Sequence, residues 1–338
     1  MEGQKLKPIT ILGAGSWGTA LALYLARRGQ TVRLWSYEIS EIAALLAERT
    51  NNQFLPGFKF PDNIEPTANL ADALKDIEDV IVAVPSIGFR DTLNMMKALI
   101  GKNTRVICAT KGLDADTGHL LHEVTTSVLG ESHPYAVISG PSFAREVAAE
   151  KPTSVNVASK DPQFLKDIGE RFNSPIFHVY PTDDVIGTEI GGVAKNVIAI
   201  ATGICDGLEL GTNARSALIT RGLAEITTLG KALGAKPETF VGLSGLGDLI
   251  LTCSDDQSRN RRLGLAIGEG KDIETAEQEI GQVVEGKNSV ELIERLAEEN
   301  GVQMPICATV SQILQGNGTA KDEFMKLMTT QNPSPVNA

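Results

Sequence analysis

The hydrophobic pattern of this chain changes once along its length, near residues 185–190. Before that point, short apolar runs alternate with stretches of helical periodicity. After it, strand-like runs almost vanish and long helical stretches follow. Strands that alternate with helices indicate a doubly wound, mainly parallel sheet. The sequence therefore predicts an α/β domain over residues 1–188, an all-α domain over residues 189–338, and a cleft between the two.

The individual elements are predicted from the length and period of these runs. Val80–Val84 is a continuous apolar run, which is typical of a strand buried on both faces. Trp17–Arg28 repeats apolar residues at intervals of three and four, as a helix does. Strands are expected at Ile9–Gly13, Thr31–Trp35, Val80–Val84, Arg105–Thr110, Ala136–Ser139, Ser154–Ala158 and Phe177–Tyr180. Helices are expected at Trp17–Arg28, Glu38–Glu48, Ile87–Ile100, His119–Leu129, Gln163–Phe172, Val185–Ile204, Ala214–Leu233, Arg262–Ile267, Ser289–Glu299 and Met304–Gln315.

The composition is that of an ordinary globular protein, and its charge is acidic. Hydrophobic residues make up 42% and charged residues 22% of the 338 residues, and the formal net charge is −11. Such a chain repels nucleic acid and anionic membranes, so neither is expected as a partner. If the substrate is an anion, its site must be locally basic.

Cysteine and histidine usage argues against a disulfide framework and against a metal site. The four cysteines have no CxxC spacing and no targeting segment is visible, which predicts reduced thiols in a cytoplasmic protein. His119 and His122 lie near Glu123, but no third ligand follows at metal spacing, so no metal is expected. The longest apolar run, Ile190–Cys205, is interpreted as too short and too polar to span a membrane.

A GxGxxG motif at Gly13–Gly18 lies between the first predicted strand and the first predicted helix. In that context Gly13 permits a tight turn, Gly15 lets the backbone approach a pyrophosphate, and Gly18 lets the helix pack on the strand. The amide groups at the helix N-terminus then hold the phosphates. The alternative is a glycine-rich turn without a ligand. The motif favours a Rossmann-like domain that binds a dinucleotide.

The choice between NAD and NADP depends on the end of the second strand. Folds that select NAD place an Asp or Glu there, about twenty residues after the motif. No acid occupies the strand end itself: Glu38 comes slightly late, and the basic Arg33 lies within the strand. This favours NADP or the use of both cofactors and leaves the choice open.

Lys195 is the only charged residue between Ile190 and Cys205. A lysine in an apolar helix costs free energy unless it is paired or reaches solvent. The glycines at 191 and 192, one turn earlier, are expected to leave space for a ligand beside it. Desolvation lowers the pKa of an amine, which suits general acid–base catalysis. The alternative is a structural lysine whose charged end reaches solvent.

Two further stretches combine polar groups with glycine or arginine. Gly245–Asp248 places a carboxylate in a predicted glycine-rich turn before an apolar run. Ser258–Arg262 places three arginines within five residues, just before a predicted helix. A helix N-terminus with Arg and Asn is a typical phosphate site. The alternative is a solvated basic loop balanced by Asp255 and Asp256.

Together, these features resemble one family along nearly the whole chain: the bacterial type of NAD(P)-dependent glycerol-3-phosphate dehydrogenase. The resemblance rests on eight motifs in the family's order, with no departure at the functional positions. The motifs are GAGSWGTA (Gly13–Ala20), ATKGL (Ala109–Leu113), SGPSFARE (Ser139–Glu146), GGVAKNVIAI (Gly191–Ile200), NARSALITRG (Asn213–Gly222), GLGDLILTC (Gly245–Cys253), SRNRR (Ser258–Arg262) and VVEG (Val283–Gly286).

The resemblance implies a role for each matching residue, with Lys195 as the catalytic lysine. It also implies a homodimer and a supply of glycerol 3-phosphate for glycerophospholipid synthesis. The substrate-binding positions it implies are Lys111, Gly140, Ser142, Lys195, Asp248, Ser258, Arg259 and Asn260. The cofactor-binding positions are Gly13, Gly15, Ser16, Trp17, Gly18, Arg33, Lys111, Ala144, Arg259, Val283 and Glu285.

The implied reaction is reversible hydride transfer between NADP(H) or NAD(H) and the pair dihydroxyacetone phosphate and sn-glycerol 3-phosphate. Negative charge develops on the carbonyl oxygen, where Lys195 stabilises it and delivers a proton. Asp248 orients or charge-balances this lysine, and Lys111 lowers its pKa. Arg259 and Asn260 fix the phosphate, which aligns the reacting carbon.

Two other functions are considered. A related dehydrogenase of hydroxyacids or hydroxyacyl compounds would more often use a catalytic His, and no His lies in residues 189–338. A non-catalytic NAD(P)-binding regulator would lose the lysine and phosphate motifs, and both are present. Consumption of NADPH with and without dihydroxyacetone phosphate distinguishes all three functions.

Overall fold

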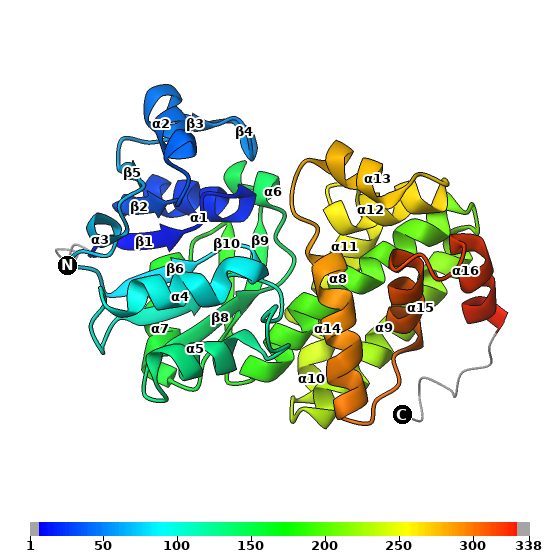
Figure 1. Cartoon of the computed structure of the whole chain (residues 1–338). Helices are drawn as coiled ribbons and strands as arrows, with labels where there is room; N and C mark the ends of the chain where they lie inside the picture. The colour runs from blue at the N-terminus through cyan, green and yellow to red at the C-terminus, as the bar shows by residue number, and fades with distance from the viewer. Residues whose placement is uncertain (1–6, 330–338) are drawn as a thin grey trace. The chain divides into compact units, whose positions relative to one another are not determined.

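The computed structural model describes residues 7–329, which form two compact units (Figure 1). The first unit contains the chain up to residue 110 together with residues 121–138 and 142–185. The second contains residues 111–120 and 139–141 together with the chain from residue 186 onward. Two short segments from the first half of the sequence therefore belong to the second unit. The single boundary at residues 188/189 stays a prediction.

The first unit is built on an eight-stranded sheet in the order β10-β9-β8-β7-β6-β1-β2-β5. Its strand pairs are parallel throughout the registers described, which confirms the predicted doubly wound sheet. The order reverses at β1, because the chain runs outward from β1 through β2 and then returns to β6 on its other side. The strands are β1 (Ile9–Leu12), β2 (Val32–Trp35), β5 (Ile64–Thr67), β6 (Asp79–Val82), β7 (Arg105–Cys108), β8 (Tyr135–Ser139), β9 (Thr153–Ala158) and β10 (Phe177–Thr182).

Helices cover both faces of this sheet, so each strand buries side chains in two directions (Figure 1). In β6, Ile81 packs into one core with α1, α6 and α7, whereas Val80 and Val82 pack into the other with α4 and α5. A strand with two buried faces reads as a continuous apolar run. The helices are α1 (Ser16–Arg27), α2 (Ile39–Glu48), α3 (Leu70–Ala73), α4 (Phe89–Lys97), α5 (Leu121–Leu129), α6 (Ala144–Ala148) and α7 (Pro162–Phe172), with a 3₁₀ turn η1 (Ser86–Gly88).

The sequence prediction missed three strands between α2 and α3. β3 (Thr50–Asn51) and β4 (Leu55–Lys59) form a separate antiparallel pair, and β5 is the edge strand beside β2. β5 contains Glu65 and Pro66, which weaken its strand pattern. Proline is tolerated there because an edge strand leaves one row of backbone groups unpaired.

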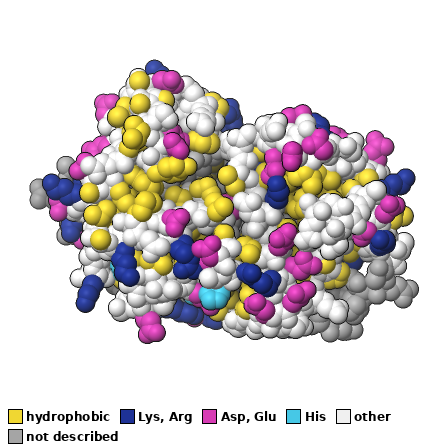
Figure 2. All heavy atoms as spheres, in the orientation of Figure 1, with side chains coloured by type: hydrophobic (Ala, Val, Ile, Leu, Met, Phe, Trp, Pro, Cys, Tyr) yellow, Lys and Arg dark blue, Asp and Glu magenta, His cyan; other side chains and the backbone are white. Residues whose placement is uncertain are grey.

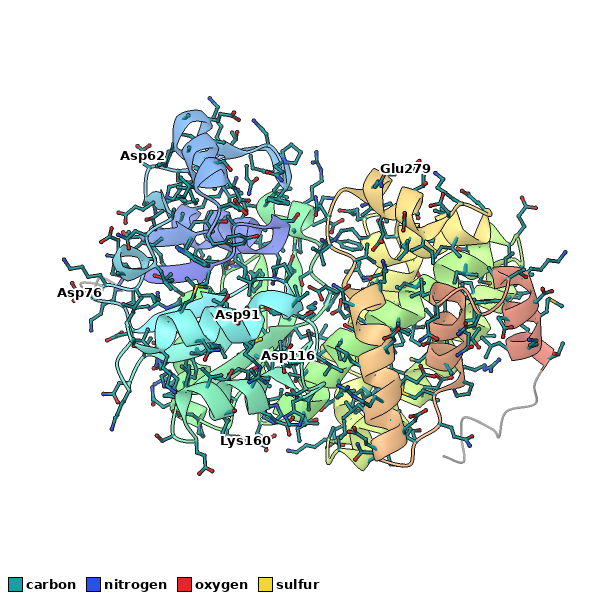
Figure 3. All side chains as sticks on the ribbon, in the orientation of Figure 1. Asp62, Asp76, Asp91, Asp116, Lys160 and Glu279 are labelled. Carbon is teal, nitrogen blue, oxygen red and sulfur yellow. The ribbon has the colours of Figure 1, made fainter. Side chains whose placement is uncertain are left out.

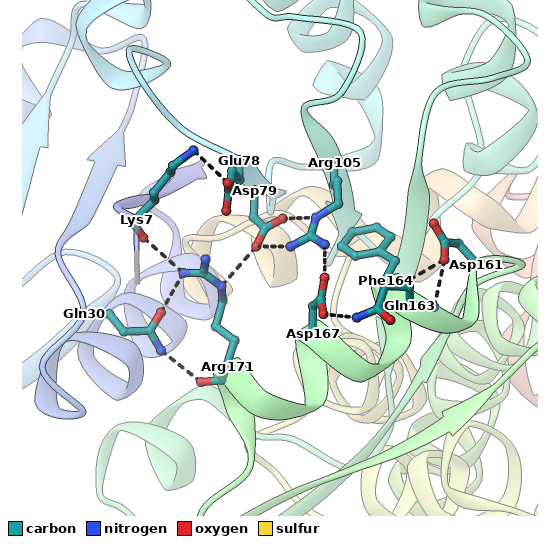
Figure 4. A network of polar contacts seen from close by, with 10 residues as sticks. All are labelled: Lys7, Gln30, Glu78, Asp79, Arg105, Asp161, Gln163, Phe164, Asp167 and Arg171. Atoms are coloured by element: carbon teal, nitrogen blue, oxygen red, sulfur yellow. Dashed lines mark hydrogen bonds and ion pairs between the residues drawn. The ribbon is translucent and has the colours of Figure 1, made fainter. Parts of the chain in front are cut away.

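Buried ion pairs tie the amino ends of β6 and β7 to α7 (Figure 4). Asp79 is 1% exposed, and its carboxylate pairs with Arg105 at 2.6 Å and with Arg171 at 3.0 Å. Arg105 also contacts Asp167, and Arg171 donates to Gln30 at 2.8 Å. Burial raises the pKa of Asp167, but hydrogen bonds from Arg105 and Gln163 outweigh it and lower the pKa.

The second unit is all helical, as predicted, and packs around α8 (Val185–Gly207). Every residue from 187 to 205 is buried. The run Ile190–Cys205 lies within the longer α8, whose 23 residues are by length and composition enough to cross a membrane, but 94% of its apolar window is buried inside the protein, as expected of a core helix. The other elements are α9 (Thr212–Ala232), α10 (Pro237–Phe240), η2 (Leu243–Gly247), α11 (Asp248–Ser254), α12 (Arg259–Gly268), α13 (Ile273–Ile280), α14 (Glu285–Glu299), α15 (Pro305–Leu314) and α16 (Ala320–Thr329).

Most charged side chains lie at the surface. On the face drawn in Figure 2, acidic and basic side chains are interspersed, and neither kind forms a continuous patch. The carboxylates labelled in Figure 3, among them Asp62, Asp91 and Glu279, belong to exposed residues. The buried charges are therefore the exceptions that require an explanation.

Candidate functional site

The three glycines of the first motif have different surroundings, all within the first unit. Gly13 has φ +113°, and a Cβ there would lie 2.7 Å from the carbonyl oxygen of Ala83. A Cβ on Gly18 would lie 2.0 Å from the carbonyl oxygen of Gly13. A Cβ on Gly15 would have no neighbour within 4 Å. The turn is therefore closely packed at Gly13 and Gly18 and open at Gly15, where a pyrophosphate requires room.

Helix α1 begins directly after Gly15, and no side chain caps its N-terminus. Its first turn contains no acidic residue that would repel an anion. Ser16 donates from Oγ to the carbonyl oxygen of Phe54 at 2.7 Å, and the Trp17 Nε1 atom is buried without a hydrogen-bond partner. Open space, helix amides and a positive dipole end together fit the phosphates of a dinucleotide.

Arg33 has contacts on β2 that point to a structural role. Its Nη1 atom donates to the carbonyl oxygens of Ala73 (3.3 Å) and Lys75, and its Nε atom lies 3.5 Å from Glu65. These contacts hold the end of α3 against β2. The cofactor role of Arg33 stays a prediction, and it is the predicted role that the geometry favours least.

In the second unit, the predicted catalytic lysine lies in a compact cluster of charges. Lys195 is 6% exposed on α8, and its Nζ atom donates to Asp248 Oδ1 at 2.5 Å and Thr252 Oγ1 at 2.8 Å. The other carboxylate oxygen of Asp248 accepts a hydrogen bond from Lys111 at 2.7 Å. Lys111 also donates to the carbonyl oxygen of Gly140 at 3.1 Å. The structure therefore brings Lys111, Gly140, Lys195 and Asp248 together.

Two ammonium groups share one carboxylate in this cluster, which leaves a net positive charge. Burial lowers the pKa of Lys195 to about 8; the carboxylate of Asp248 opposes this shift, and the charge of Lys111 adds to it. A lysine whose pKa lies near neutrality can exchange a proton with a bound substrate. The excess positive charge also stabilises an oxyanion.

The two glycines beside Lys195 pack against protein and do not leave room for a ligand, so that expectation is wrong. A Cβ on Gly191 would lie 2.2 Å from the carbonyl oxygen of Ser244, and one on Gly192 would lie 2.7 Å from Ser139 Oγ. Gly191 thus lets α8 approach η2, a π-helical turn at the place where a glycine-rich turn was predicted. This close contact places Asp248, the first residue of α11, beside Lys195.

The arginine-rich motif begins helix α12, and its arginines face different partners. Ser258 caps the helix by accepting from the amide of Arg261 at 3.2 Å. The Arg261 side chain pairs with Asp206 at 2.5 Å and with Asp256 at 3.0 Å. Arg261 therefore anchors the helix start, while Arg259 remains beside the start of α14.

Arg259 lies near the predicted cofactor motif at the start of α14. Its Nη1 atom donates to Gln282 Oε1 at 3.4 Å. Burial lowers the pKa of its guanidinium, and the carboxylate of Glu285 opposes that shift. Val283, which is 41% exposed, precedes the helix. Ser142 and Ala144, two other predicted contacts, lie after β8 and belong to the first unit.

A relay of amide groups joins three helices in the second unit. Asn260 donates from Nδ2 to Asn196 Oδ1 at 3.0 Å and accepts at Oδ1 from the amide of Gly286 at 2.8 Å. Asn196 is 5% exposed and directly follows Lys195. These hydrogen bonds therefore fix the arginine-rich motif of α12 to α8 and to the start of α14.

Sequence reasoning did not assign Asn196 or Thr252 to the site. Asn196 had a signal, because it is a second polar residue in the same apolar stretch as Lys195. Thr252 lies one turn after Asp248, where its hydroxyl donates back to the Asp248 carbonyl at 2.6 Å. Its spacing alone does not distinguish it from an ordinary helix residue. Within residues 7–329, no three His, Cys, Asp or Glu side chains form a group that could hold a metal.

Comparison with known proteins gives matches over both halves of the chain. The family described as NAD-dependent glycerol-3-phosphate dehydrogenase matches residues 8–165 with its N-terminus and residues 184–325 with its C-terminus. The glycerol-3-phosphate dehydrogenase (NAD(P)+) of Shewanella sediminis is 51% identical over 321 residues, which is 95% of each chain. That of Coxiella burnetii is 52% identical over 307 residues, which is 91% of this chain and 92% of the relative.

A solved structure agrees with these matches. The crystal structure of glycerol-3-phosphate dehydrogenase from Coxiella burnetii superposes with a TM-score of 0.95 at 49% identity. The superposition covers 97% of this chain and 100% of that chain. Sequence and fold thus agree over nearly the whole length, and the chain belongs to the family of NAD(P)-dependent glycerol-3-phosphate dehydrogenases.

Proposed function

We propose that this chain catalyses the reversible reduction of dihydroxyacetone phosphate to sn-glycerol 3-phosphate with NADH or NADPH. The observation that carries the proposal is the buried Lys195, which shares the carboxylate of Asp248 with Lys111. A buried lysine with a lowered pKa and a neighbouring cation suits reduction of a carbonyl group in an anionic substrate. The names of the relatives support the same reaction.

The proposed chemistry assigns the proton to Lys195. A bound nicotinamide would supply the hydride for the new C–H bond at the carbonyl carbon. The carbonyl oxygen takes a proton from the Lys195 ammonium group, so one hydride and one proton together reduce the ketone. Asp248 holds the Lys195 Nζ atom, and Thr252 fixes it from a second side.

The remaining predicted residues bind the two ligands. Arg259, Ser258 and Asn260 hold the substrate phosphate at the start of α12, where the helix dipole adds to the arginine charge. Lys111, Gly140 and Ser142 complete the substrate site. The cofactor is bound by the Gly13–Gly18 turn with Ser16 and Trp17, and by Lys111, Ala144, Arg259, Val283 and Glu285.

The proposal extends to the setting of the enzyme. As in the resemblance drawn from the sequence, we infer a cytoplasmic homodimer whose product supplies glycerophospholipid synthesis. Sedimentation equilibrium tests the dimer. Depletion of the protein in a cell, followed by measurement of glycerol 3-phosphate, tests its metabolic role.

One assay tests the reaction. The purified protein is mixed with NADH or NADPH, and absorbance of the reduced nicotinamide is followed with and without dihydroxyacetone phosphate. We expect oxidation that requires this substrate and yields glycerol 3-phosphate. Oxidation with unphosphorylated 2-oxo acids in its place would instead favour a hydroxyacid dehydrogenase. Cofactor binding without any turnover would favour a regulator.

A further inference from the structure

The carboxyl end of β2 lies directly beside the glycine turn of the first unit. The amide of Gly13 donates to the carbonyl oxygen of Trp35, the last residue of β2, at 2.9 Å. In sheets of this kind, the side chains that follow the second strand contact the adenosine ribose of the dinucleotide. The next residue, Ser36, is 5% exposed. The surroundings of Ser36 therefore decide which ribose is accepted.

The carboxylate of Glu41, from the following helix α2, contacts Ser36. The Ser36 hydroxyl donates to Glu41 Oε2, and it accepts from the amide of Glu38 at 3.4 Å. Glu41 is half-buried in the first turn of α2. Within residues 7–329, the carboxylate of Glu41 has no other hydrogen bond or ion pair. One carboxylate oxygen is therefore left to accept a hydrogen bond from a ligand.

Basic side chains are absent from this segment. Residues 36–48 contain no Lys or Arg, whereas they contain Glu38, Glu41 and Glu48. The arginines that flank the segment have other partners. Arg49 donates to the carbonyl oxygens of residues 61 and 64, and Arg33 donates to those of residues 73 and 75. A 2′-phosphate needs a nearby cation, and this segment does not supply one.

We propose that Glu41, held by Ser36, binds the 2′-hydroxyl of the adenosine ribose and makes this enzyme prefer NADH to NADPH. The 2′-phosphate of NADPH would face the Glu41 carboxylate and meet like-charge repulsion. The sequence favoured NADP or the use of both cofactors, because the strand end itself carries no acid. The fold supplies the acid from α2 instead. This inference rests on the proposed function, because it concerns the cofactor of that reaction.

Equilibrium binding tests the proposal without turnover. Dissociation constants for NADH and NADPH are measured by nicotinamide fluorescence in the wild type, Glu41→Gln and Glu48→Gln. Glu48 lies on the same helix and bonds the exposed Asn52, so its substitution controls for a general loss of charge. Circular dichroism confirms that each variant is folded.

We expect the wild type to bind NADH at least about tenfold more tightly than NADPH, as one unscreened like-charge contact would produce. Glu41→Gln should narrow this ratio severalfold, chiefly by tightening NADPH binding, while Glu48→Gln leaves the ratio unchanged. Glu41→Lys should reverse the preference. Competition by 5′-AMP and 2′,5′-ADP should follow the same order as the two cofactors.

Three results would overturn the inference: equal or tighter binding of NADPH by the wild type, the same change of ratio in both glutamine variants, or an unchanged ratio in Glu41→Gln. None of these bears on the reaction itself. Failure of the proposed function would appear as the absence of oxidation dependent on dihydroxyacetone phosphate with either cofactor. Either idea can therefore fail while the other stands.

Discussion

Lys195 determines when the proposed proton transfer can occur. Its ammonium group must be present for the reduction, and its pKa is lowered to about 8. We therefore expect kcat for reduction to fall as pH rises above about 8, approaching tenfold per pH unit. Lys195→Met keeps most of the side-chain volume and removes the ammonium group, so kcat should fall by about 10²–10⁴-fold, without that pH dependence.

The exposed Lys231 on α9 supplies the matched control, because Lys231→Met removes a charge outside the cluster. NADH binding should be nearly unchanged in both variants. A loss of only a few fold in Lys195→Met, or equal losses in both variants, would make Lys195 a structural lysine. Steady-state kinetics across pH 6–10, with NADH titrations at each pH, provide the measurement.

Arg259 is the arginine that begins α12 at the proposed phosphate site, whereas Arg261 is paired with Asp206 and Asp256. Hydrogen bonds to a charged group contribute about 1.5–3 kcal/mol each. Arg259→Ala should therefore lower kcat/KM for dihydroxyacetone phosphate by at least about tenfold at saturating cofactor. Unphosphorylated dihydroxyacetone makes no such contact, so its poor rate should change far less.

Equal proportional losses for the two substrates would show that Arg259 does not bind the phosphate. The site would then have to be sought at Lys111, because Arg261 is occupied by its two carboxylates. An increase in KM for the cofactor in Arg259→Ala is also expected, since Arg259 lies near Gln282 and Glu285. Saturating cofactor separates that effect from the loss of substrate binding.

Individual residues differ in how far the sequence reveals them. Lys195 can be identified from the sequence, because a charged residue within an apolar helix costs free energy unless it is paired or functional. Gly191 was misjudged, because sequence does not show whether a glycine faces a ligand or a neighbouring backbone; here its hydrogens face the carbonyl oxygen of Ser244. Glu41 reaches the end of β2 only through the first turn of α2, five residues after its partner Ser36.

Among the helices, the start of α15 depends on a carboxylate from α9. Glu225 is 8% exposed, and its two oxygens accept from the amide of Ile306 at 3.0 and 3.1 Å. Burial raises the pKa of Glu225 from 4.5 to about 7, although the amides of Ile306 and Cys307 oppose the shift. No other side chain caps this end of α15 within the described part of the chain.

This raised pKa predicts how stability depends on pH. A carboxyl group with a higher pKa in the folded state stabilises the fold below its unfolded pKa, and that contribution is lost as pH rises from about 4.5 to about 7. Glu225→Gln keeps an acceptor but cannot ionise. Relative to the wild type, it should gain about 1–3 kcal/mol of unfolding free energy between pH 5 and 7.5.

Glu225→Ala is the contrasting variant, because it removes the acceptor as well as the charge. It should destabilise the protein by about 0.5–2 kcal/mol at pH 5, the usual cost of a lost helix cap. Because alanine cannot ionise either, this deficit relative to the wild type should shrink or reverse at pH 7.5, by the same amount that Glu225→Gln gains. Urea denaturation at pH 5 and 7.5 measures all three proteins. A Glu225→Gln variant whose stability relative to the wild type does not change with pH would contradict the assigned pKa.

The predictability of each element follows from the strength of its periodic pattern. The central strands, such as β6, were found because burial on both faces produces a continuous apolar run. β5 was missed because an edge strand tolerates Glu65 and Pro66. A glycine-rich turn was predicted at η2, but its π-helical form was not, since Gly-Leu-Gly at residues 245–247 has no helical signature. Tertiary packing against Gly191 determines its conformation instead.

For the whole molecule, the sequence predicted two folds but not which unit holds each segment. Residues 111–120 come after β7, and residues 139–141 begin at the last residue of β8, yet both segments belong to the second unit. This assignment matters because it brings Lys111 and Gly140 to the Lys195 cluster. The unit to which such a segment belongs cannot be predicted from local hydrophobic periodicity, because it depends on contacts between residues far apart in the sequence.

Cofactor binding can be measured through the thermal stability of the whole protein. A ligand that binds only the folded protein stabilises it by about 2.7 kcal/mol at one hundred times its dissociation constant. NADH at that concentration should raise Tm by several degrees.

Gly15→Val places its side chain in open space at φ −69°, so Tm without ligand should stay near that of the wild type. Its branched side chain occupies the room that the pyrophosphate requires, and the shift with NADH should disappear. Gly18→Ala is the opposite case, since its Cβ would lie 2.0 Å from the Gly13 carbonyl oxygen and should lower Tm without any ligand. An undiminished NADH shift in folded Gly15→Val would mean that the Gly13–Gly18 turn is structural and that the dinucleotide binds elsewhere.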